Sequence, residues 1–226
     1  MQKTVFMVNA HPDDLNGSAG LAWILVEAGY TLRVIDFTRG ERGLERQGVS
    51  MEACGAMRTA EEETACAMLG ITPTFLHEID GEACAPKETC QELADLMAAD
   101  RPCAVITHWP VDRHIDHVMT GAATLAALRL SGIKTEVFFH NQTYQTLNMP
   151  FLRYVPFGQH IMDLKCRLLE SYVCQNGHDI AERKVCEGRF WGWRCGKAPY
   201  AEVYGSYQMP DDPSPFFDEL NYDILK

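Results

Sequence analysis

One stretch decides the fold: Val8-Asn9-Ala10-His11-Pro12-Asp13-Asp14-Leu15-Asn16-Gly17. It places a histidine and two aspartates directly after an apolar run. Residues Thr4–Ala10 are rich in β-branched and apolar side chains, which predicts a buried strand. In open α/β sheets, ligands bind beyond the carboxyl ends of the strands. A strand that ends in a histidine and two aspartates is therefore expected to end at the floor of a functional site.

Strand-like and helix-like segments alternate through the first half of the chain. This order predicts an α/β fold with a Rossmann-like, mostly parallel sheet and helices on both faces. The further expected strands are Thr31–Thr38, Thr74–Ile79, Pro102–Thr107 and Thr135–Phe139, and the expected helices are Ser18–Ala28, Ala53–Leu69, Lys87–Ala99 and His117–Leu130.

The pattern is less regular from about residue 141 onward. It contains an amphipathic helix at Met162–Cys174, an aromatic segment at Phe190–Trp193 and a late strand at Tyr200–Tyr204. We expect one domain over residues 1–226, with an α/β core over about 1–140 and an irregular C-terminal cap over 141–226.

The composition narrows the class of protein. The chain has 226 residues, and 46% of them are hydrophobic, enough for a sizeable core. A net charge of −11 argues against a nucleic-acid groove or an anionic membrane surface as the partner. The sequence has no apolar run that could span a bilayer and no signal-peptide pattern, and its nine cysteines include no C-x-x-C pair. These features predict a cytoplasmic protein with reduced cysteines.

A second polar cluster, His108-Trp109-Pro110-Val111-Asp112-Arg113-His114-Ile115-Asp116-His117, follows the fourth expected strand. A doubly wound sheet usually places its first and fourth strands side by side, so the two clusters are expected to meet. Histidines and aspartates together suit a catalytic zinc or iron(II) ion with a position left open for water. Taken singly, Asp112 and Asp116 also fit helix N-caps, but the two clusters at matching strand ends favour the metal.

Other active-site classes lack their motifs. Residues Gly17–Gly20 resemble a phosphate-binding turn only weakly, because both G-x-G-x-x-G and the P-loop lysine are missing. There is also no G-x-S-x-G elbow for a serine hydrolase. A nucleotide-binding protein is therefore a weak alternative.

Both clusters resemble signatures of the PIG-L/LmbE-like N-acetylglucosaminyl deacetylases. The A-H-P-D-D signature is intact at Ala10–Asp14, and the H-x-P-x-D-x-H-x-D-H pattern matches His108–His117. Weaker similarities cover Thr38–Glu41, Arg58–Glu61 and Tyr200–Glu202. Where the family usually has glutamate after the two aspartates, this chain has Leu15 and a shorter turn, a departure that bears on the choice of substrate.

The resemblance implies roles for five residues. His11, Asp14 and His117 would bind the divalent metal, most simply Zn²⁺, with Fe²⁺ as the alternative. Asp13 would be the general base, and a protonated His114 would stabilise the charge that develops on the carbonyl oxygen.

Four further residues are predicted to support the site. The resemblance makes Arg58 a contact of the sugar, and Asp80 joins it because it follows the third expected strand at the same sheet edge. Asp112 and Asp116 are candidates to hold the second ring nitrogen of a metal-binding imidazole, as carboxylates commonly do.

The resemblance thus implies a zinc-dependent deacetylase that removes an acetyl group from an N-acetylglucosamine-type conjugate. Two alternatives stay open: an amidase that cleaves another acyl amide or a thiol conjugate, and a non-catalytic metal- or sugar-binding protein of the same fold. The expected partner is a small-molecule sugar conjugate, without nucleic acid or a membrane span. Such relatives are often oligomeric, so a homo-oligomer is a further expectation.

Overall fold

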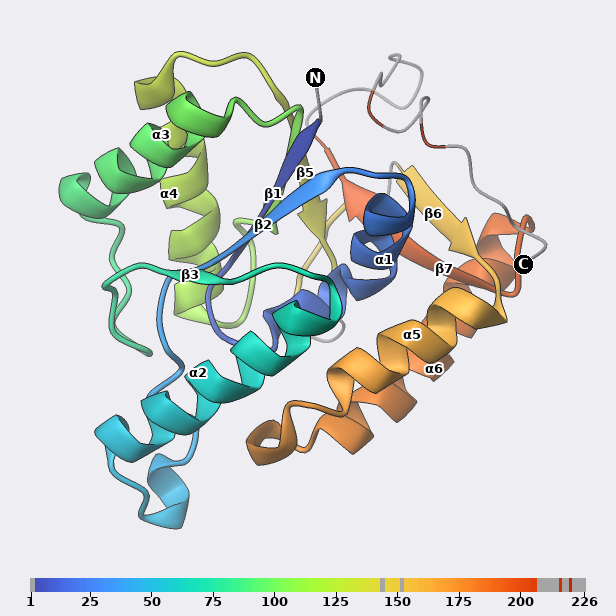
Figure 1. The fold of residues 1–226 in the computed structure, drawn as a ribbon, viewed down its shortest axis with the longest axis horizontal. Coiled ribbons are helices and arrows are strands. Elements are labelled where there is room, and N and C mark those ends of the chain that lie inside the picture. The colour runs from blue at the N-terminus through green and yellow to red at the C-terminus, as the bar shows by residue number, and fades with distance from the viewer. Residues whose placement is uncertain (1–2, 143–144, 151–152, 207–215, 217–219, 221–226) are drawn as a thin grey trace.

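A seven-stranded sheet in the order β3-β2-β1-β4-β5-β7-β6 organises the fold (Figure 1). The computed structural model describes residues 3–142, 145–150, 153–206, 216 and 220. Within them, the first five strands run parallel, whereas β7 pairs antiparallel with both β5 and β6. The predicted α/β class and mostly parallel sheet are confirmed. The strands are β1 Thr4–Asn9, β2 Thr31–Asp36, β3 Thr74–Phe75, β4 Ala104–His108, β5 Glu136–His140, β6 Arg153–Phe157 and β7 Tyr200–Gly205.

Helices cover both faces of this sheet, and each face has its own apolar core (Figure 1). Alternate residues of β1 point to opposite faces, as its pleat requires. Val5 and Met7 join the core under α1, α2, α5 and α6, whereas Phe6 and Val8 join the core under α3 and α4. The helices are α1 Ala19–Glu27, α2 Met51–Met68, α3 Lys87–Asp100, α4 Ile115–Ser131, α5 Gln159–Leu169 and α6 Gly177–Cys195.

Two secondary-structure boundaries expected near the site are wrong. The third strand, expected over Thr74–Ile79, forms ladder pairs only at Thr74–Phe75. The N–H groups of Leu76 and Glu78 still bond the end of β2, and the chain then turns so that Asp80 lies against His11. Helix α4, expected from His117, begins at Ile115, and the side chain of His114 caps it by accepting the N–H of Asp116 at 3.3 Å. The polar cluster after β4 therefore continues directly into the first turn of α4.

The described part of the region after residue 141 is more regular than expected. The expected helix at Met162–Cys174 ends as α5 at Leu169, and a short 3-10 turn, η3 Val173–Gln175, follows it. The aromatic segment Phe190–Trp193 lies inside α6, a helix of 19 residues that the sequence analysis missed. Strand β6 was also missed, whereas the late strand is present as β7. The division of the chain into core and cap stays a prediction.

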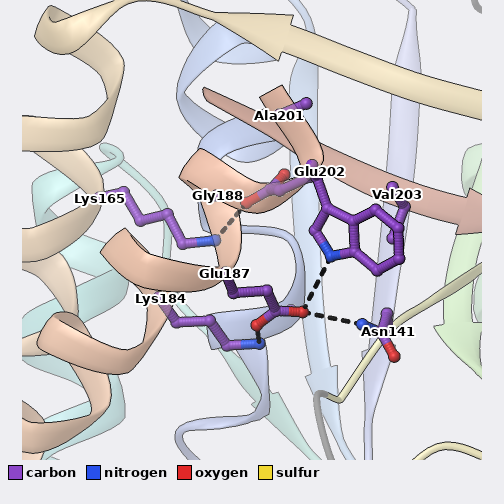
Figure 2. Close-up of a pocket in the computed structure, with 10 residues that line it drawn as sticks. Asn141, Lys165, Lys184, Glu187, Gly188, Ala201, Glu202 and Val203 are labelled. Atoms are coloured by element: carbon purple, nitrogen blue, oxygen red, sulfur yellow. Dashed lines mark hydrogen bonds and ion pairs between the residues drawn. The ribbon is translucent and has the colours of Figure 1, made fainter. Parts of the chain in front are cut away.

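A buried carboxylate joins the C-terminal region to the N-terminal half. Glu202 on β7 accepts the N–H groups of Gly20 and Leu21 at 2.8 and 2.9 Å, so it satisfies the N-terminal end of α1. Lys165 of α5 donates to the same carboxylate at 2.5 Å. Beside this pair, Lys184 and Glu187 of α6 form a second one at 2.8 Å (Figure 2). The late Tyr200–Glu202 motif therefore has a structural part in the fold.

Among the described residues, the helices nowhere combine the length and the hydropathy needed to cross a bilayer.

The close contact of α4 with the end of β4 gives a stability prediction. A Cβ atom added at Gly121 would lie 2.6 Å from the carbonyl oxygen of His108. Alanine is favoured over glycine within a helix by about 1 kcal/mol, but this overlap forces backbone to move at a cost of roughly 1–3 kcal/mol. We expect Gly121→Ala to lower the free energy of unfolding, measured by denaturant titration.

Gly55→Ala is the matched control for this substitution. Its added Cβ would meet the Cβ of Glu41 at 3.3 Å, a contact that small shifts relieve. The alanine should therefore leave stability unchanged or raise it. Equal effects of the two substitutions would contradict the assigned packing of α4.

Candidate metal centre

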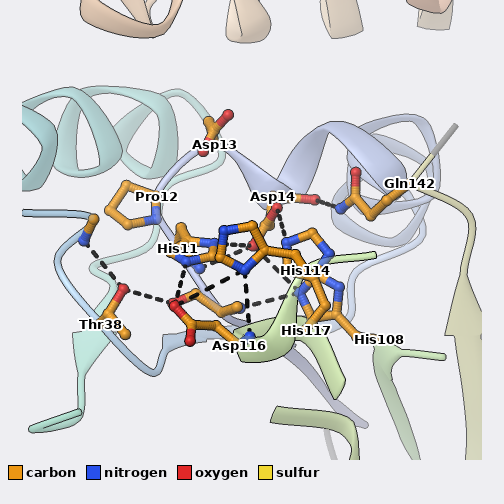
Figure 3. A network of polar contacts seen from close by, with 12 residues as sticks. His11, Pro12, Asp13, Asp14, Thr38, His108, His114, Asp116, His117 and Gln142 are labelled. Carbon is orange, nitrogen blue, oxygen red and sulfur yellow. Dashed lines mark hydrogen bonds and ion pairs between the residues drawn. The ribbon is translucent and has the colours of Figure 1, made fainter. Parts of the chain in front are cut away.

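The loops after β1 and β4 meet, as expected for neighbouring parallel strands, and the carboxylate of Asp14 lies at the junction (Figure 3). Its Oδ2 lies 3.2 Å from Nδ1 of His11 and 3.3 Å from Nε2 of His108, and its Oδ1 lies 3.4 Å from Nε2 of His117. Asp14 is only 5% exposed. One buried carboxylate thus meets imidazoles from both polar clusters.

The other ring nitrogens of His11 and His117 also face carboxylates. Nε2 of His11 lies 3.0 Å from Oδ2 of Asp116 and 3.3 Å from Oδ1 of Asp80. Nδ1 of His117 lies 3.1 Å from Oδ1 of Asp112. Carboxylates in these positions orient an imidazole and make its remaining nitrogen a stronger ligand.

Burial and mutual charge set the protonation of the centre. Burial pushes the pKa of Asp14 upward, but His117 and His108 outweigh it and hold that pKa well below its usual range. Burial also opposes the charge on His117, yet Asp14 and Asp112 raise its pKa to about 9. In the metal-free protein, Asp14 is therefore ionised and His117 carries a proton that a metal ion must displace.

His11, Asp14 and His117 fit a divalent ion. Their ligand atoms all lie within 4.8 Å of one another, and the contacts of Asp14 with the two histidines measure 3.2 and 3.4 Å. Ligand atoms that share a tetrahedral zinc ion are separated by about 3.3 Å. Two imidazoles and one carboxylate also leave an open position, as catalytic sites require.

A second set of metal-compatible groups shares His11 and consists of His11, Asp80, His114 and Asp116. Its carboxylates already have backbone partners: Asp116 accepts the N–H groups of Gly81 and Ala83, and Asp80 accepts that of Arg42. We interpret both carboxylates as supports of His11, because they hold its outer nitrogen and close the loop after β3 against it.

A pair of neutral histidines lies behind Asp14. Nε2 of His108 lies 3.1 Å from the backbone nitrogen of Ala10 and 3.3 Å from Oδ2 of Asp14, and its Nδ1 faces Nε2 of His140 at 3.3 Å. Burial lowers the pKa of His108 to about 4 and holds that of His140 well below its usual range. Both rings therefore stay uncharged beside the centre and fix the position of the loop that carries His11.

Asp13 lies apart from the imidazoles, on the side of α2 (Figure 3). Its φ of 92° is in the left-handed region, which few residues other than glycine adopt. Its carboxylate lies 2.5 Å from the guanidinium of Arg58. Burial raises the pKa of Asp13 to about 6 although Arg58 opposes the shift, which places the titration of this carboxylate near neutral pH.

The centre opens into a pocket of about 300 Å³ that Asp13 and His114 also line. An adjoining cavity of about 260 Å³ shares the residues Asp13, Asn16, Gln145 and Gln175 with it and continues toward α6. The metal-compatible residues therefore face a cleft large enough for a small substrate.

Comparison with known proteins assigns the family. The family model described as GlcNAc-PI de-N-acetylase, PIG-L, matches residues 6–128. The chain belongs to the PIG-L family. The matched range holds both polar clusters and ends within α4.

Proteins similar to this PIG-L chain have two kinds of activity in their names. A 4-oxalmesaconate hydratase of Pseudomonas putida is 35% identical over 113 residues, which are 47% of this chain and 44% of that protein, so the match spans less than half of the relative. The structure of GalB, the 4-carboxy-2-hydroxymuconate hydratase of P. putida, superposes with a TM-score of 0.81 at 19% identity, over 94% of this chain and 99% of that one. The N,N'-diacetylchitobiose deacetylase of Pyrococcus horikoshii gives a TM-score of 0.78 at 22% identity, over 96% and 88%. At these identities the two structural matches support the fold alone.

The structure brings all nine residues predicted from the sequence to one region of this PIG-L fold, although their roles stay predictions. Two of them have surroundings other than those expected. Arg58, expected to contact a sugar, is 4% exposed and bonded within the protein, and Asp80 lies against His11. His114, expected as a cation, has its pKa lowered by burial and by His11, so it is neutral near pH 7.

Two supports of the site were not predicted from the sequence. His140 was interpreted as an ordinary core or surface histidine, yet β5 pairs it in register with His108 at the end of β4. Its position at the carboxyl end of a neighbouring parallel strand was the available signal. Glu62 lies one helical turn after Arg58 on α2, and its Oε2 accepts the N–H of Asp13 at 3.3 Å. That i, i+4 spacing on a buried helix face could have revealed it.

Asp112 provides a test of the PIG-L metal centre. It accepts from His117 and also from the N–H of His114, at 2.9 Å. We expect Asp112→Asn to weaken metal affinity by about 10- to 100-fold, because a ligating imidazole loses its charged support. Competition with a chromogenic chelator measures this affinity. Asp100→Asn, which alters only a surface pair with Arg33, is the control. Unchanged metal affinity in Asp112→Asn would show that Asp112 does not support His117 as a ligand.

The metal-free protein should lose stability as pH rises from about 6.5 to 9. The folded pKa of His117, about 9, exceeds its unfolded value of about 6.5, so its contribution is complete below pH 6.5 and is lost through pH 9. The raised pKa values of Asp13 and Glu62, about 6 and 7, act in the same direction at lower pH. Thermal unfolding after chelation measures the change, and His117→Gln should reduce it. A part should remain, because, against the effect of burial, Asp116 and Asp14 also raise the pKa of His11. A slope of the same size in that variant would show that other groups cause it.

Proposed function

We propose that this protein is a metal-dependent hydrolase that removes an acetyl group from an N-acetylglucosamine-type conjugate. The observation that carries the proposal is the meeting of His11, Asp14 and His117 at the floor of a pocket that Asp13 and His114 also line. The metal, by donor set a zinc or iron(II) ion, would be held by these three residues. When bound, it lowers the pKa of a water molecule and polarises the amide carbonyl.

Asp13 acts as the general base in this proposal. Its carboxylate lines the pocket, and its pKa of about 6 keeps it ionised at neutral pH and able to accept a proton from the attacking water. The same carboxyl group can then return that proton to the departing amine. Acetate and the free amine are the products.

His114 donates a hydrogen bond to the oxygen that becomes negative. Its Nδ1 accepts the N–H of Asp116, so the proton of the neutral ring is on Nε2. A neutral imidazole in this position stabilises an oxyanion by hydrogen bonding without a net charge of its own. Loss of such a donor commonly costs about 3–4 kcal/mol of transition-state stabilisation.

Carboxamide groups in the wall of the adjoining cavity support a hydroxyl-rich substrate. Asn16, Gln142, Gln145 and Gln175 supply four of them, beside Arg183 and a Lys184 that is paired with Glu187. Asn16 and Gln142 donate to the backbone carbonyls of Asp13 and Asp14 at 2.7 Å each, which leaves their own carbonyl oxygens available as acceptors. Sugar hydroxyls donate to such groups.

A location in the cytoplasm remains a prediction from the sequence.

A hydratase is the second candidate, and the 35% identity to 4-oxalmesaconate hydratase favours it. A metal-held water and an adjacent base suit addition of water to an activated double bond as well as attack on an amide. Such a reaction would use the same five residues, but the substrates in the names of the similar hydratases carry several carboxylates. The substrate-facing wall, not the metal centre, would separate the two activities.

One assay compares both candidates. The chelated protein is reloaded with zinc or iron(II), and acetate release from N-acetylglucosamine conjugates is measured beside hydration of 4-oxalmesaconate. We expect acetate release that depends on added metal. Hydration without acetate release would replace the first candidate by the second, and a metal-loaded protein inactive on both would favour a binding protein.

The base is tested in the same assay. Asp13→Asn should retain the metal and lower kcat by about 10²- to 10⁴-fold. Metal content measured by elemental analysis separates this loss from a damaged centre. Full activity in Asp13→Asn would show that another group takes the proton.

A further inference from the structure

We propose that Arg58 is a positioning residue that holds the base Asp13 in its working orientation, instead of a contact of the substrate. This inference rests on the proposed function, because it assumes that Asp13 acts as the base. Among the described residues, Arg58 is the only buried arginine that lines the pocket, and the inference gives it a role different from the one expected from the sequence. The α2 side of the site would then serve the geometry of catalysis.

The guanidinium of Arg58 is surrounded by acceptors from the loops that it joins. Nη2 donates to Oδ1 of Asp13 at 2.5 Å and also to the carbonyl oxygen of Pro12. Nη1 donates to the carbonyl oxygen of Gly40 at 3.1 Å. One side chain therefore links α2, the loop after β1 and the turn after β2, and charge-assisted bonds of this kind are the stronger ones in proteins.

The turn after β2 leaves room for this guanidinium. Gly40 has a φ of +63°, and a Cβ atom added there would lie 2.2 Å from Nη1 and 2.4 Å from Cζ of Arg58. A Cβ added at Gly43 would lie 2.8 Å from Nη1. Both glycines of the Arg39-Gly40-Glu41-Arg42-Gly43 turn thus let the backbone approach the arginine closely, which fixes where its charge lies.

The backbone of Asp13 is held as firmly as its side chain. Oε2 of Glu62 accepts its N–H, and Asn16 donates to its carbonyl oxygen from its own N–H at 2.9 Å and from its side chain at 2.7 Å. Backbone conformations such as φ 92° cost of order 1–3 kcal/mol and persist where the surroundings impose them. Arg58 and Glu62, one turn apart on α2, supply two of these contacts.

This arrangement leaves Arg58 little capacity for a substrate. The residue is 4% exposed, both terminal nitrogens of its guanidinium donate within the protein, and its Nε, which has no hydrogen-bond partner among the described residues, is buried away from the surface. A substrate group that recruited it would have to release Asp13. Because a reacting group displaced by about 1 Å can lose about 100-fold in rate, orientation of Asp13 is the larger benefit.

Arg58→Ala is the central variant of the test. We expect kcat to fall by about 10- to 100-fold while KM stays within threefold of the wild type and the metal content is unchanged. Added ethylguanidinium should restore part of kcat by occupying the vacated site. Should Arg58→Ala fail to fold, Arg58→Lys supplies the same kcat and KM comparison.

A double substitution identifies the residue through which Arg58 acts. In the Asp13→Asn background, Arg58→Ala should change kcat less than twofold, because the base is already absent. Multiplicative losses, or a rise in KM at constant kcat, would overturn the proposal and return Arg58 to the substrate. Arg39→Ala is the control: Arg39 is exposed and also bonds α2, through Thr59, but does not reach Asp13. An inactive wild type would instead reject the proposed function itself.

Discussion

The ionised carboxylate of Asp14 is the interaction on which the rest of the site depends. Burying a charge costs several kcal/mol unless partners compensate it, and here the partners come from two loops that are almost a hundred residues apart in sequence. His11 lies on the same loop, and His108 and His117 come from the end of β4 and the start of α4. The parallel pairing of β1 with β4 makes this meeting possible. A divalent ion held by His11, Asp14 and His117 would take the place of the protons that these groups share.

Around that carboxylate, different parts of the chain orient the metal-compatible imidazoles and the carboxylate of Asp13. Carboxylates at the outer nitrogens of His11 and His117 orient the metal-compatible rings, whereas α2 and the glycine turn orient Asp13. In the proposed function, the substrate meets a third set of residues, the carboxamides between the pocket and α6. The chemistry of water activation can stay constant while the wall that selects the substrate changes.

Much of the centre could be predicted from the sequence because its motifs lie at strand ends. The apolar run before His11 and the second cluster before α4 determined both the sheet and the meeting of the loops. The contacts of Arg58 could not be predicted, because they depend on how closely the turn at Gly40 approaches α2. Neither could the early end of β3, because the regular ladder stops at Phe75 although the N–H groups of Leu76 and Glu78 still bond the end of β2. Helix α6 was missed because its outward face carries exposed aromatic residues, Phe190 and Trp193, which disturb the amphipathic pattern.

The carboxylate of Glu202 has a consequence for how such proteins diversify. The family match ends at residue 128, yet α1, which follows the turn bearing Asp14, begins on a side chain that the chain supplies some 180 residues later. The C-terminal segment is therefore not an interchangeable module. A chimera with a different C-terminal segment needs a carboxylate at the position of Glu202 on β7. Without it, the N–H groups of Gly20 and Leu21 at the start of α1 lose their acceptor.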